Sequence, residues 1–583
     1  MRANPQDASS FDFEGRAIPM AAGMTIAAAL TAAGELALKH DRQGGRRGVF
    51  CGMGVCQECL VTVEGRPLRA CMTAAQPGVR VVRSPALANL DQVPRARRQG
   101  DPRASAEPTD ERSTPAETLR SCDLLVIGGG PAGLSAAAVA AEAGLDVVIV
   151  DERAKLGGQY FKQPSGPGRE PSADAQFAAG RALIQRALAA GVEVHSDTSV
   201  WGAFGLDAIR AISPDGGRRY ACKGLVLAPG AYERGVPFPG WTLPGVMTTG
   251  AAQTLWRSHG VAPGERVLIS GNGPLNMQVA AELTAAGARI VAVAEVAAAP
   301  TPARVPALIR MALADPGLVR AGLAYRATLA RARVPVMYGA AVTRVEGDGR
   351  ARSAVVTPVS AGGRRGAGGE RRFAVDAVCL GFGFVPSTEI ARSLGCRHEY
   401  ATDAGHLVTA VDGCGATSVE RVWVVGDGGG IRGARHDQVQ GELAACDALR
   451  TLYPTGSGSP PRSARAAARA AARHRRFQDA LTTVYAAPIF NAELADPETE
   501  LCRCEGVTRR AVERALAAGA GHAGAIKRET RAGMGPCQGR YCGPVIAAMV
   551  ASSAGEAPGE LSGYAPSPPT RPVEIEALLR ATD

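Results

Sequence analysis

Eight of the 14 cysteines in this 583-residue chain fall into two groups of four, and their spacing could hold metal. The groups are Cys51, Cys56, Cys59 and Cys71 near the N-terminus, and Cys502, Cys504, Cys537 and Cys542 near the C-terminus. Four thiolates can bind a [2Fe–2S] cluster or a zinc ion. The sequence therefore predicts two metal or iron–sulfur sites, one in each terminal part of the chain.

The N-terminal group has the spacing C-x4-C-x2-C-x11-C. Its first three cysteines match plant-type [2Fe–2S] ligation, in which a fourth cysteine follows at a distance. Gly52 and Gly54 allow the loop to curl so that backbone N–H groups face the sulfur atoms. Residues 60–68 predict a hairpin that returns the chain to Cys71. Zinc more often takes two C-x2-C pairs, so we expect a [2Fe–2S] cluster, with zinc as the alternative.

The C-terminal group has the spacing C-x-C-x32-C-x4-C, and residues 507–530 between the two pairs contain helix-forming stretches. Together with residues 533–542 (GMGPCQGRYC), this pattern resembles the bacterioferritin-associated-ferredoxin-like domain, a [2Fe–2S] fold built from helices. The resemblance implies a second cluster, and zinc is again the alternative.

The central part of the chain predicts a nucleotide site. An apolar strand over residues 123–127 leads into Gly128-x-Gly130-x-x-Gly133 and an Ala-rich helix. The first glycine permits a tight turn, the second lets a pyrophosphate approach, and the third allows close helix–strand packing. Asp151 closes the next predicted strand, where an acid can hold ribose hydroxyls. A packing turn without a ligand is the alternative.

Three further motifs indicate that this nucleotide is FAD. Gly157 and Gly158 follow Asp151, residues 225–230 form a short strand and turn, and residues 422–428 contain Asp427. Together they resemble the flavoproteins with two dinucleotide-binding domains. The resemblance implies FAD contacts at Gly128, Gly130, Pro131, Ala132, Gly133, Asp151, Glu152, Gly157, Gly158, Gln159, Gly230, Gly426 and Asp427.

A second strand–turn–helix unit begins at residues 266–270. Gly271 and Gly273 match the first two glycines of the motif, but Asn276 stands where the third small residue is expected. Glu295 closes the following strand and favours a 2′-hydroxyl over a 2′-phosphate. Three alternatives stay open for Gly271, Gly273 and Glu295: NAD(P), another adenine nucleotide held for structure, or an empty relic.

The sequence disfavours a disulfide reductase, because no cysteine pair lies in residues 157–162 or in the second glycine loop. The six other cysteines are widely separated and are predicted to be buried thiols. They are Cys122, Cys222, Cys379, Cys396, Cys414 and Cys446.

Composition excludes several classes of function. The net charge of +10 comes from 65 basic against 55 acidic residues, and much of it lies in residues 95–112 and 462–476. Aromatic residues make up only 4%, so we expect no nucleic-acid binding. No apolar run reaches 18 residues and no secretory signal is visible, which predicts no membrane span. We expect a cytoplasmic protein, either free or peripheral to the inner membrane.

Residues 230–253, GNGPLN, residues 381–389 and the C-terminal tetrad together resemble the α subunit of heteromeric flavoprotein dehydrogenases. That group includes opine oxidases, D-hydroxyproline dehydrogenase, hydrogen cyanide synthase and the heteromeric sarcosine-oxidase type. The resemblance implies an αβ hetero-oligomer in which a β flavoprotein, similar to amino-acid oxidases, oxidises an amino acid, imino acid or opine. It also implies an FMN at the subunit interface as a further cofactor. The ferredoxin-like small subunit of some members is fused here at the N-terminus.

Two other functions compete with this electron-transferring role. A self-sufficient NAD(P)H-dependent reductase would load electrons at the second glycine loop, and an iron–sulfur scaffold or sensor would need no flavin fold. No residue is assigned to substrate chemistry. His436, near the expected flavin turn, is interpreted as a solvated residue at a helix start rather than as an acid or base.

The expected fold class is α/β: a doubly wound flavoprotein with a ferredoxin-like α+β domain before it and a helical [2Fe–2S] domain after it. The predicted boundaries are 1–94 (ferredoxin-like), 95–120 (linker), 121–240 (FAD domain, first part), 241–371 (NAD(P)-binding-like), 372–453 (FAD domain, second part), 454–480 (basic linker and helix), 481–555 (helical [2Fe–2S] domain) and 556–583 (tail).

Overall fold

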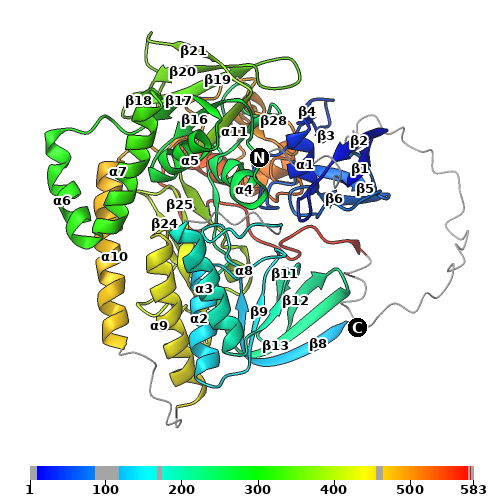
Figure 1. Ribbon diagram of the computed structural model, residues 1–583, viewed down its shortest axis with the longest axis vertical. Helices are drawn as coiled ribbons and strands as arrows, with labels where there is room; N and C mark the ends of the chain where they lie inside the picture. Colours follow the sequence, from blue (N-terminus) through cyan, green and yellow to red (C-terminus); the bar gives the residue numbers. More distant parts are fainter. Residues whose placement is uncertain (1–8, 86–116, 167–173, 455–463, 576–577, 579–583) are drawn as a thin grey trace, which may run out of the picture.

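The computed structural model describes residues 9–85, 117–166, 174–454, 464–575 and 578. Two α/β domains form the middle of the molecule, and the N-terminal and C-terminal domains lie beside the upper one in Figure 1. Residues 95–116 and 455–463, which make up most of the predicted linkers, lie outside the described residues. None of the helices within the described ranges is long and apolar enough to cross a membrane.

The first α/β domain is built on a sheet with the strand order β10-β9-β8-β13-β12-β11, and β26 pairs with β13. Its strands are β8 (Thr118–Ile127), β9 (Val147–Val150), β10 (Glu193–His195), β11 (Ser199–Ala203), β12 (Ile209–Ser213), β13 (Gly216–Leu227) and β26 (Val422–Val424). The parallel strands carry continuous apolar runs because both faces of the sheet are covered. Helix α2 (Pro131–Glu142) packs between α3 (Ala175–Ala189) and α9 (Ala434–Leu452), as Figure 1 shows.

Strand β8 begins at Thr118, although residues up to 120 were expected to belong to the linker. The additional residues pair in parallel with the start of β13, for example Thr118 with Arg218. This pairing joins segments 100 residues apart in the chain, so the local composition of the polar N-terminal half of β8 does not reveal it.

The second α/β domain has the strand order β15-β22-β16-β17-β18. Its strands are β15 (Val246–Thr248), β16 (Arg266–Gly271), β17 (Arg289–Glu295), β18 (Val336–Tyr338) and β22 (Ala377–Gly381). Its helices are α4 (Thr249–His259), α5 (Pro274–Ala285), α6 (Val305–Ala314) and α7 (Pro316–Arg331), with the 3-10 turn η2 (Pro302–Arg304) before α6. An antiparallel sheet of β19 (Ala340–Glu346), β20 (Ser353–Pro358) and β21 (Arg371–Ala374) extends it.

The return from the second domain to the first comes later than residue 372, the predicted start of the second part of the FAD domain. Strand β22 still pairs in parallel with β15 and β16, and only β26 rejoins the first sheet. A short apolar strand such as β22 suits either sheet, and its partners decide the assignment. Between β22 and β26 lie β23 (Phe384–Pro386), α8 (Glu389–Ser393), β24 (His398–Ala401) and β25 (His406–Thr409). Strand β23 pairs with β14 (Ala231–Glu233), which lies before the second domain, and η3 (Gly426–Gly429) follows β26.

The N-terminal domain is a mixed sheet with the strand order β2-β1-β7-β5-β6. Its elements are β1 (Ser10–Phe13), β2 (Arg16–Pro19), α1 (Ile26–Ala32), β3 (Lys39–His40), β4 (Arg46–Arg47), β5 (Leu60–Val63), β6 (Arg66–Arg69) and β7 (Arg80–Arg83). Thr25 caps α1 by accepting a hydrogen bond from the N–H group of Ala28, and the buried apolar residues of α1 pack on the sheet. Strands β5 and β6 form the hairpin expected between the third and fourth cysteines.

The C-terminal domain follows the long helix α10 (Ala464–Val484), which packs against α6 and α9. It contains the short strands β27 (Glu500–Cys502) and β28 (Val507–Thr508) and the helices α11 (Arg509–Ala517), α12 (Ala523–Thr530) and α13 (Gly543–Ala554). The segment after α13 returns across the molecule. Within it the side chain of Tyr564 lies against Gly533 and Gly539, and Thr570 binds the carbonyl of Trp201 in the first α/β domain.

Close packing of α2 against α9 depends on Gly441. A Cβ atom at this position would lie 2.1 Å from the carbonyl oxygen of Ala132, which belongs to the backbone of α2. Backbone cannot move aside as a flexible side chain can, so any larger residue must separate the two helices. This contact also holds the start of α2 beside the turn at residues 426–429.

We therefore expect Gly441→Ala to destabilise the chain by about 1–3 kcal/mol, because the helices cannot approach as closely. Gly322→Ala is the matched control, because Gly322 also lies inside a helix but a Cβ there meets nothing within 4 Å. The control should keep or slightly raise the midpoint of thermal unfolding, since alanine favours helix over glycine. Circular dichroism during heating measures both midpoints, and equal effects of the two substitutions would contradict the packing argument.

Candidate functional site

The N-terminal cysteines meet in the loop before β5 and in the turn after β6. Cys51, Cys56 and Cys59 are buried and Cys71 is partly buried. Their sulfurs are arranged in two hydrogen-bonded pairs, Cys51 with Cys56 and Cys59 with Cys71. Backbone N–H groups also face sulfur: that of Cys56 lies 3.4 Å from Sγ of Cys51. The glycine-containing loop therefore curls around the sulfurs as the sequence predicts.

These hydrogen bonds favour ionised sulfur at Cys51. Burial opposes ionisation of Cys51, but hydrogen bonds from Cys56 and from backbone N–H groups lower the pKa of its thiol to about 6. Thiolate is the form that binds metal. The donors that lower this pKa are the groups that would face a cluster.

The C-terminal cysteines are brought together by the turns on either side of α11 and α12. Cys502 ends β27, Cys504 lies in the following turn, and Cys542 immediately precedes α13. All four are buried. Cys502 is hydrogen-bonded to Cys504 and Cys542, and Cys504 to Cys537, so the four sulfurs form one connected group.

Both tetrads fit a two-iron cluster. A [2Fe–2S] cluster is held by four cysteine sulfurs, two on each iron, so pairs of neighbouring sulfurs are the expected arrangement. In the described part of the chain, no group of three or more His, Cys, Asp or Glu side chains is placed to hold a single metal ion. The N-terminal sulfurs form two such pairs, and the C-terminal sulfurs form one connected group of four.

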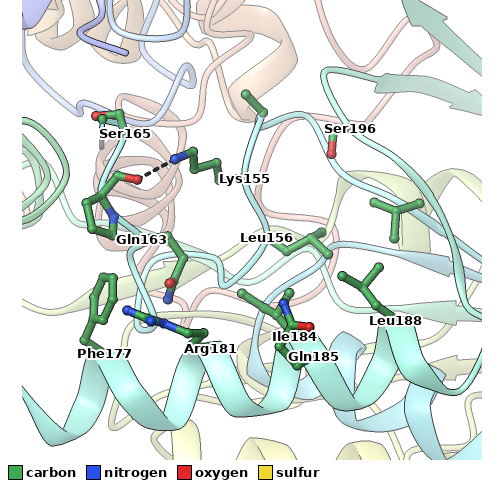
Figure 2. Close-up of a pocket in the computed structure, with 14 residues that line it drawn as sticks. Lys155, Leu156, Gln163, Ser165, Phe177, Arg181, Ile184, Gln185, Leu188 and Ser196 are labelled. Carbon is green, nitrogen blue, oxygen red and sulfur yellow. Dashed lines mark hydrogen bonds between the residues drawn. The ribbon is translucent and has the colours of Figure 1, made fainter. Parts of the chain in front are cut away.

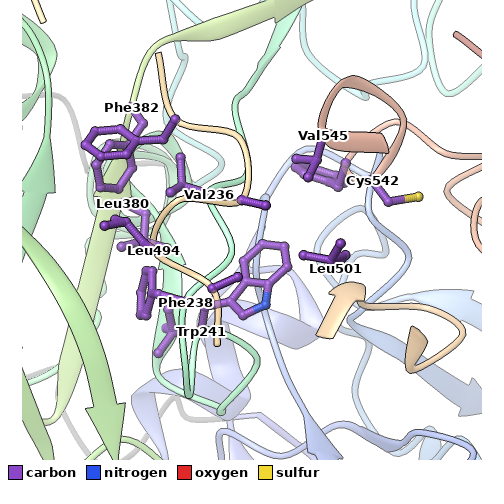
Figure 3. Close-up of a cluster of buried hydrophobic side chains, with 14 of the residues drawn as sticks. Val236, Phe238, Trp241, Leu380, Phe382, Leu494, Leu501, Cys542 and Val545 are labelled. Atoms are coloured by element: carbon purple, nitrogen blue, oxygen red, sulfur yellow. The ribbon is translucent and has the colours of Figure 1, made fainter. Parts of the chain in front are cut away.

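Two of the N-terminal cysteines, Cys51 and Cys56, share one hydrophobic core with the four C-terminal cysteines, which the sequence did not reveal. Phe50, directly before Cys51, packs edge-on against Trp241 and Tyr541, with ring centroids 5.8 and 5.2 Å apart. In Figure 3, Trp241 lies between side chains of the second α/β domain on one side and Leu501, Cys542 and Val545 of the C-terminal domain on the other. Three domains thus meet where the cysteine loops lie.

A group of buried charges fills the same region. Glu58, between Cys56 and Cys59, is fully buried, and its carboxylate lies 3.0 Å from Nζ of Lys39 and 3.4 Å from Nε of Arg503. Burial raises the pKa of Glu58, but the charges of Lys39, Arg503 and Arg47 outweigh it and lower the pKa overall. Glu58 is therefore held ionised beside both cysteine loops.

The first glycine loop has the expected form. Gly128 adopts a φ of 108°, and Gly130 precedes α2 without a side-chain cap, which leaves the first N–H groups of the helix free to bind an anion. Gly158 lies so close that a Cβ there would come within 2.9 Å of the Cα atom of Gly130. The structure thus brings residues 157–158 onto the glycine loop, as the motif predicts for a bound dinucleotide.

Asp151 and Glu152 differ in their surroundings. Asp151 accepts hydrogen bonds from the N–H groups of Gly129 (2.6 Å) and Arg153 (2.8 Å), while burial raises its pKa to about 6. Glu152 instead forms ion pairs with Arg69 of the N-terminal domain and Arg571 of the C-terminal segment. Asp151 is placed beside the glycine loop, whereas Glu152 joins three parts of the chain.

Residues 422–428, the last of the three motifs expected to contact FAD, lie in β26 and η3, shortly before α9. Gly426 donates its N–H group to Gln440, and burial together with the charge of Asp437 raises the pKa of Asp427. His436 is buried rather than solvated, and its pKa falls to about 4 through burial and the nearby charges of Arg432 and of Arg475 on α10. Nδ1 of His436 and Oδ1 of Asp437 have no hydrogen-bond partner among the described residues. Such orphaned polar atoms fit a site that a polar cofactor completes.

A buried charged group beside residues 157–159 was missed by sequence reasoning. Nζ of Lys162 donates to the carbonyl of Gln159 (2.6 Å) and to the side chain of Gln253 (2.8 Å), and burial lowers its pKa to about 7. Glu233 accepts the N–H group of Gly250, and burial raises its pKa to about 7. The only sequence signal is that Lys162 closely follows the glycine pair. Perturbed pKa values of this kind gather at functional sites.

Arg153 links the first glycine loop to the N-terminal cysteines. Its guanidinium donates to the carbonyl oxygen of Gly52 at 3.3 Å. On the other side, a Cβ at Gly52 would lie 2.9 Å from the Cα atom of Ala251 in α4. The cysteine loop therefore rests directly on the two α/β domains.

The second glycine loop is partly occupied by the chain itself. Glu295 accepts the N–H groups of Gly273 and Ala297, and burial raises its pKa to about 7. Asn276, in place of a small residue, is buried and donates to the carbonyl of Gly381 at 2.9 Å. The side chain of Asn272 donates to the carbonyl of Tyr485, so the segment following α10 crosses this loop.

A cavity of about 630 Å³ lies between residues 154–166 and α3 (Figure 2). Leu156 faces α3 across it, and Nζ of Lys155 donates to the carbonyl of Pro164 at its edge. Among the described residues, the lining includes no carboxylate, histidine or cysteine, and its charged side chains are Lys155 and Arg181.

Three family matches divide the chain in the same way as its cysteines and glycines. Residues 6–86 match the 2Fe-2S iron-sulfur cluster binding domain, and residues 501–552 match the BFD-like [2Fe-2S] binding domain. Residues 122–441 match the pyridine nucleotide-disulphide oxidoreductase family. These matches confirm the predicted fold class.

Relatives extend over most of the chain. An opine oxidase subunit of Agrobacterium tumefaciens is 33% identical over 78% of this chain and 91% of its own length. Hydrogen cyanide synthase subunit HcnB of Pseudomonas aeruginosa is 33% identical over 72% of this chain and 90% of its own length. In structure, the chain is similar to L-proline dehydrogenase from P. horikoshii, with a TM-score of 0.69, 19% identity and coverage of 99% and 98%. The chain therefore belongs to the family of these opine oxidase and hydrogen cyanide synthase subunits, built on the pyridine nucleotide-disulphide oxidoreductase fold with a [2Fe–2S] domain on either side.

Proposed function

We propose that this chain is the electron-transferring α subunit of a heteromeric dehydrogenase that oxidises an amino acid, imino acid or opine. The observation that carries the proposal is that Cys51 and Cys56 share one buried core with all four C-terminal cysteines. The N-terminal cysteine loop also contacts Arg153, which lies next to the first glycine loop through its hydrogen bond to Asp151. Its relatives are themselves named as subunits, and one of them, the alpha subunit of sarcosine oxidase from Rhizobium meliloti, is 26% identical over 79% of this chain. A subunit of this kind carries electrons, and a partner supplies the substrate pocket.

FAD is the cofactor proposed for the first glycine loop. Gly128, Gly130 and Gly133, with Pro131 and Ala132, would hold its pyrophosphate at the start of α2, where the helix dipole favours negative charge. Asp151 would hold the ribose and Asp427 the ribityl chain. Gly157, Gly158, Gln159, Gly230 and Gly426 would line the cofactor, whereas the ion pairs of Glu152 favour a structural role for that residue.

The eight clustered cysteines are proposed to hold two [2Fe–2S] clusters: Cys51, Cys56, Cys59 and Cys71 one, and Cys502, Cys504, Cys537 and Cys542 the other. When bound, FAD supplies two-electron chemistry and the clusters supply one-electron chemistry, a combination suited to dividing an electron pair. The protein residues exclude water from both sulfur groups and fix them beside each other. A β flavoprotein would carry the substrate, with an FMN at the subunit interface as a further cofactor.

The partner requirement gives the first test of this function. With opines and cyclic imino acids as substrates under anaerobic conditions, visible absorbance should show flavin and cluster reduction in the αβ complex and none in the isolated chain. Dithionite reduction of the isolated chain serves as the control that its cofactors are present. Substrate-dependent reduction of the isolated, dithionite-responsive chain would contradict the proposal, because the substrate pocket would then lie on this chain.

A self-sufficient NAD(P)H-dependent reductase is the second candidate. The position of Glu295, hydrogen-bonded to the second glycine loop, favours it. The carbonyls of Val484 and Tyr485, which bind Arg304 and Asn272, place part of the chain across that loop and oppose it. We therefore propose that Gly271, Gly273 and Glu295 hold at most an adenine nucleotide for structure and do not accept a hydride donor.

NADH provides the second test. Stopped-flow absorbance should show no flavin reduction of the isolated chain by NADH or NADPH on the timescale of turnover, because the segment after α10 crosses the second glycine loop. Equilibrium dialysis with ADP and with NAD⁺ separates the structural-nucleotide alternative from an empty loop. Rapid reduction of the flavin by NADH would contradict this proposal and favour the self-sufficient reductase.

A further inference from the structure

The ion pair between Glu58 and Arg503 joins the two cysteine loops directly. Glu58 lies between Cys56 and Cys59, and Arg503 lies between Cys502 and Cys504. Oε2 of Glu58 is 3.4 Å from Nε of Arg503, and the two side chains are 0% and 3% exposed. Each tetrad therefore contributes one charged residue from inside its own ligand motif to a contact with the other tetrad.

Arg503 is held from three sides. Its guanidinium carbon lies 3.9 Å from the ring centroid of Phe50 and 4.7 Å from that of Trp241, and Nη1 donates to the carbonyl of Trp241 at 2.6 Å. These rings come from the N-terminal domain and the second α/β domain. A planar guanidinium can stack and pair at the same time, which an ammonium group cannot. These contacts therefore require arginine at position 503, and they fix the orientation of the C-terminal domain.

The charges around this pair are balanced. Glu58 also meets Lys39 at 3.0 Å and Arg47 at 3.7 Å, and Arg47 pairs with Asp41 and with Glu500 of the C-terminal domain at 2.5 and 2.6 Å. Three cations therefore face three carboxylates inside the interface. The oxygens of Glu58 find no well-aligned hydrogen-bond donor among the described residues, so this carboxylate acts mainly through its charge.

A buried ion pair is a weak source of stability, because desolvation offsets its attraction, and its best-attested use is to fix one arrangement. Here the arrangement that it fixes is that of two cysteine loops. The interior also screens charges poorly, so each charge acts on both loops. Lys39 lies close enough to interact electrostatically with both Cys56 and Cys504.

We propose that Glu58 and Arg503 are positioning residues shared by both iron–sulfur sites, which dock the N-terminal domain rigidly on the C-terminal domain and set the reduction potentials of both clusters together. The inference rests on the proposed function, because it requires both tetrads to hold clusters. The N-terminal domain then acts as a fixed part of the electron path rather than as a tethered carrier.

The sign of the expected effect follows from charge. Each cluster becomes more negative by one charge on reduction, so a nearby carboxylate opposes reduction and a nearby cation favours it. Glu58→Gln should therefore raise the reduction potentials of both clusters, and Lys39→Gln should lower both. If Glu58 and Lys39 only held the structure together, removing the negative charge would not raise both reduction potentials, and removing the positive charge of its partner would not lower both.

The test is an anaerobic redox titration of the full chain, in which electron paramagnetic resonance follows the two cluster signals. Glu58→Gln and Lys39→Gln should shift both midpoints in opposite directions, and Arg503→Lys, which keeps the charge, should shift neither midpoint as far. Lys39 is not part of either cysteine motif, so its variant carries the test if Glu58→Gln fails to retain its clusters.

Glu389→Gln is the matched control. Glu389 pairs with Arg540 at 3.0 Å and also docks the C-terminal domain, but this pair lies outside the contact between the tetrads. Loss of the pair between Glu389 and Arg540 should leave the midpoint potential of one of the two clusters unchanged. A shift of only one midpoint in Glu58→Gln and in Lys39→Gln would overturn the inference. Absence of two [2Fe–2S] signals in the unmodified chain would instead overturn the proposed function.

Discussion

The structure depends on burying ionisable sulfur and charge in one place without leaving that charge unpaired. Six of the eight clustered cysteines lie in one core formed by three domains, and six charged side chains lie beside them, where an isolated charge would be very unfavourable. Each carboxylate there has a cation, and the N-terminal sulfurs face backbone N–H groups. The rest of the fold, including the return of the chain after α13, serves to bring these segments together.

The two α/β domains provide the second part of the site by local means. A strand that runs into a glycine turn and then a helix leaves N–H groups free at the helix start, and this happens once in each domain. The copies have since diverged. The first accepts residues 157–158 against its turn, whereas the second is crossed by the segment after α10. The same local geometry can therefore hold a cofactor in the first domain, whereas in the second domain it packs against another segment of the chain.

Local spacing was sufficient to predict much of this site. The glycines at 128, 130 and 133 and the eight clustered cysteines follow recognisable spacing patterns, and the structure brings each group together. Partners distant in sequence were not predictable in this way. The contact of Glu58 with Arg503 spans 445 residues, and β22 joins the second sheet through pairing that its own apolar residues do not specify. His436 was misjudged because α9 packs against other helices, including α10, whose Arg475 lies near His436 although it is 39 residues away in sequence.

The central claim is that two iron–sulfur clusters and one flavin share this chain, and metal and flavin analysis of anaerobically purified protein tests it most directly. The account predicts about four iron atoms, two for each [2Fe–2S] cluster, and about one FAD per chain, with little zinc. Zinc in place of iron at either tetrad, or protein that retains its fold without iron, would contradict it.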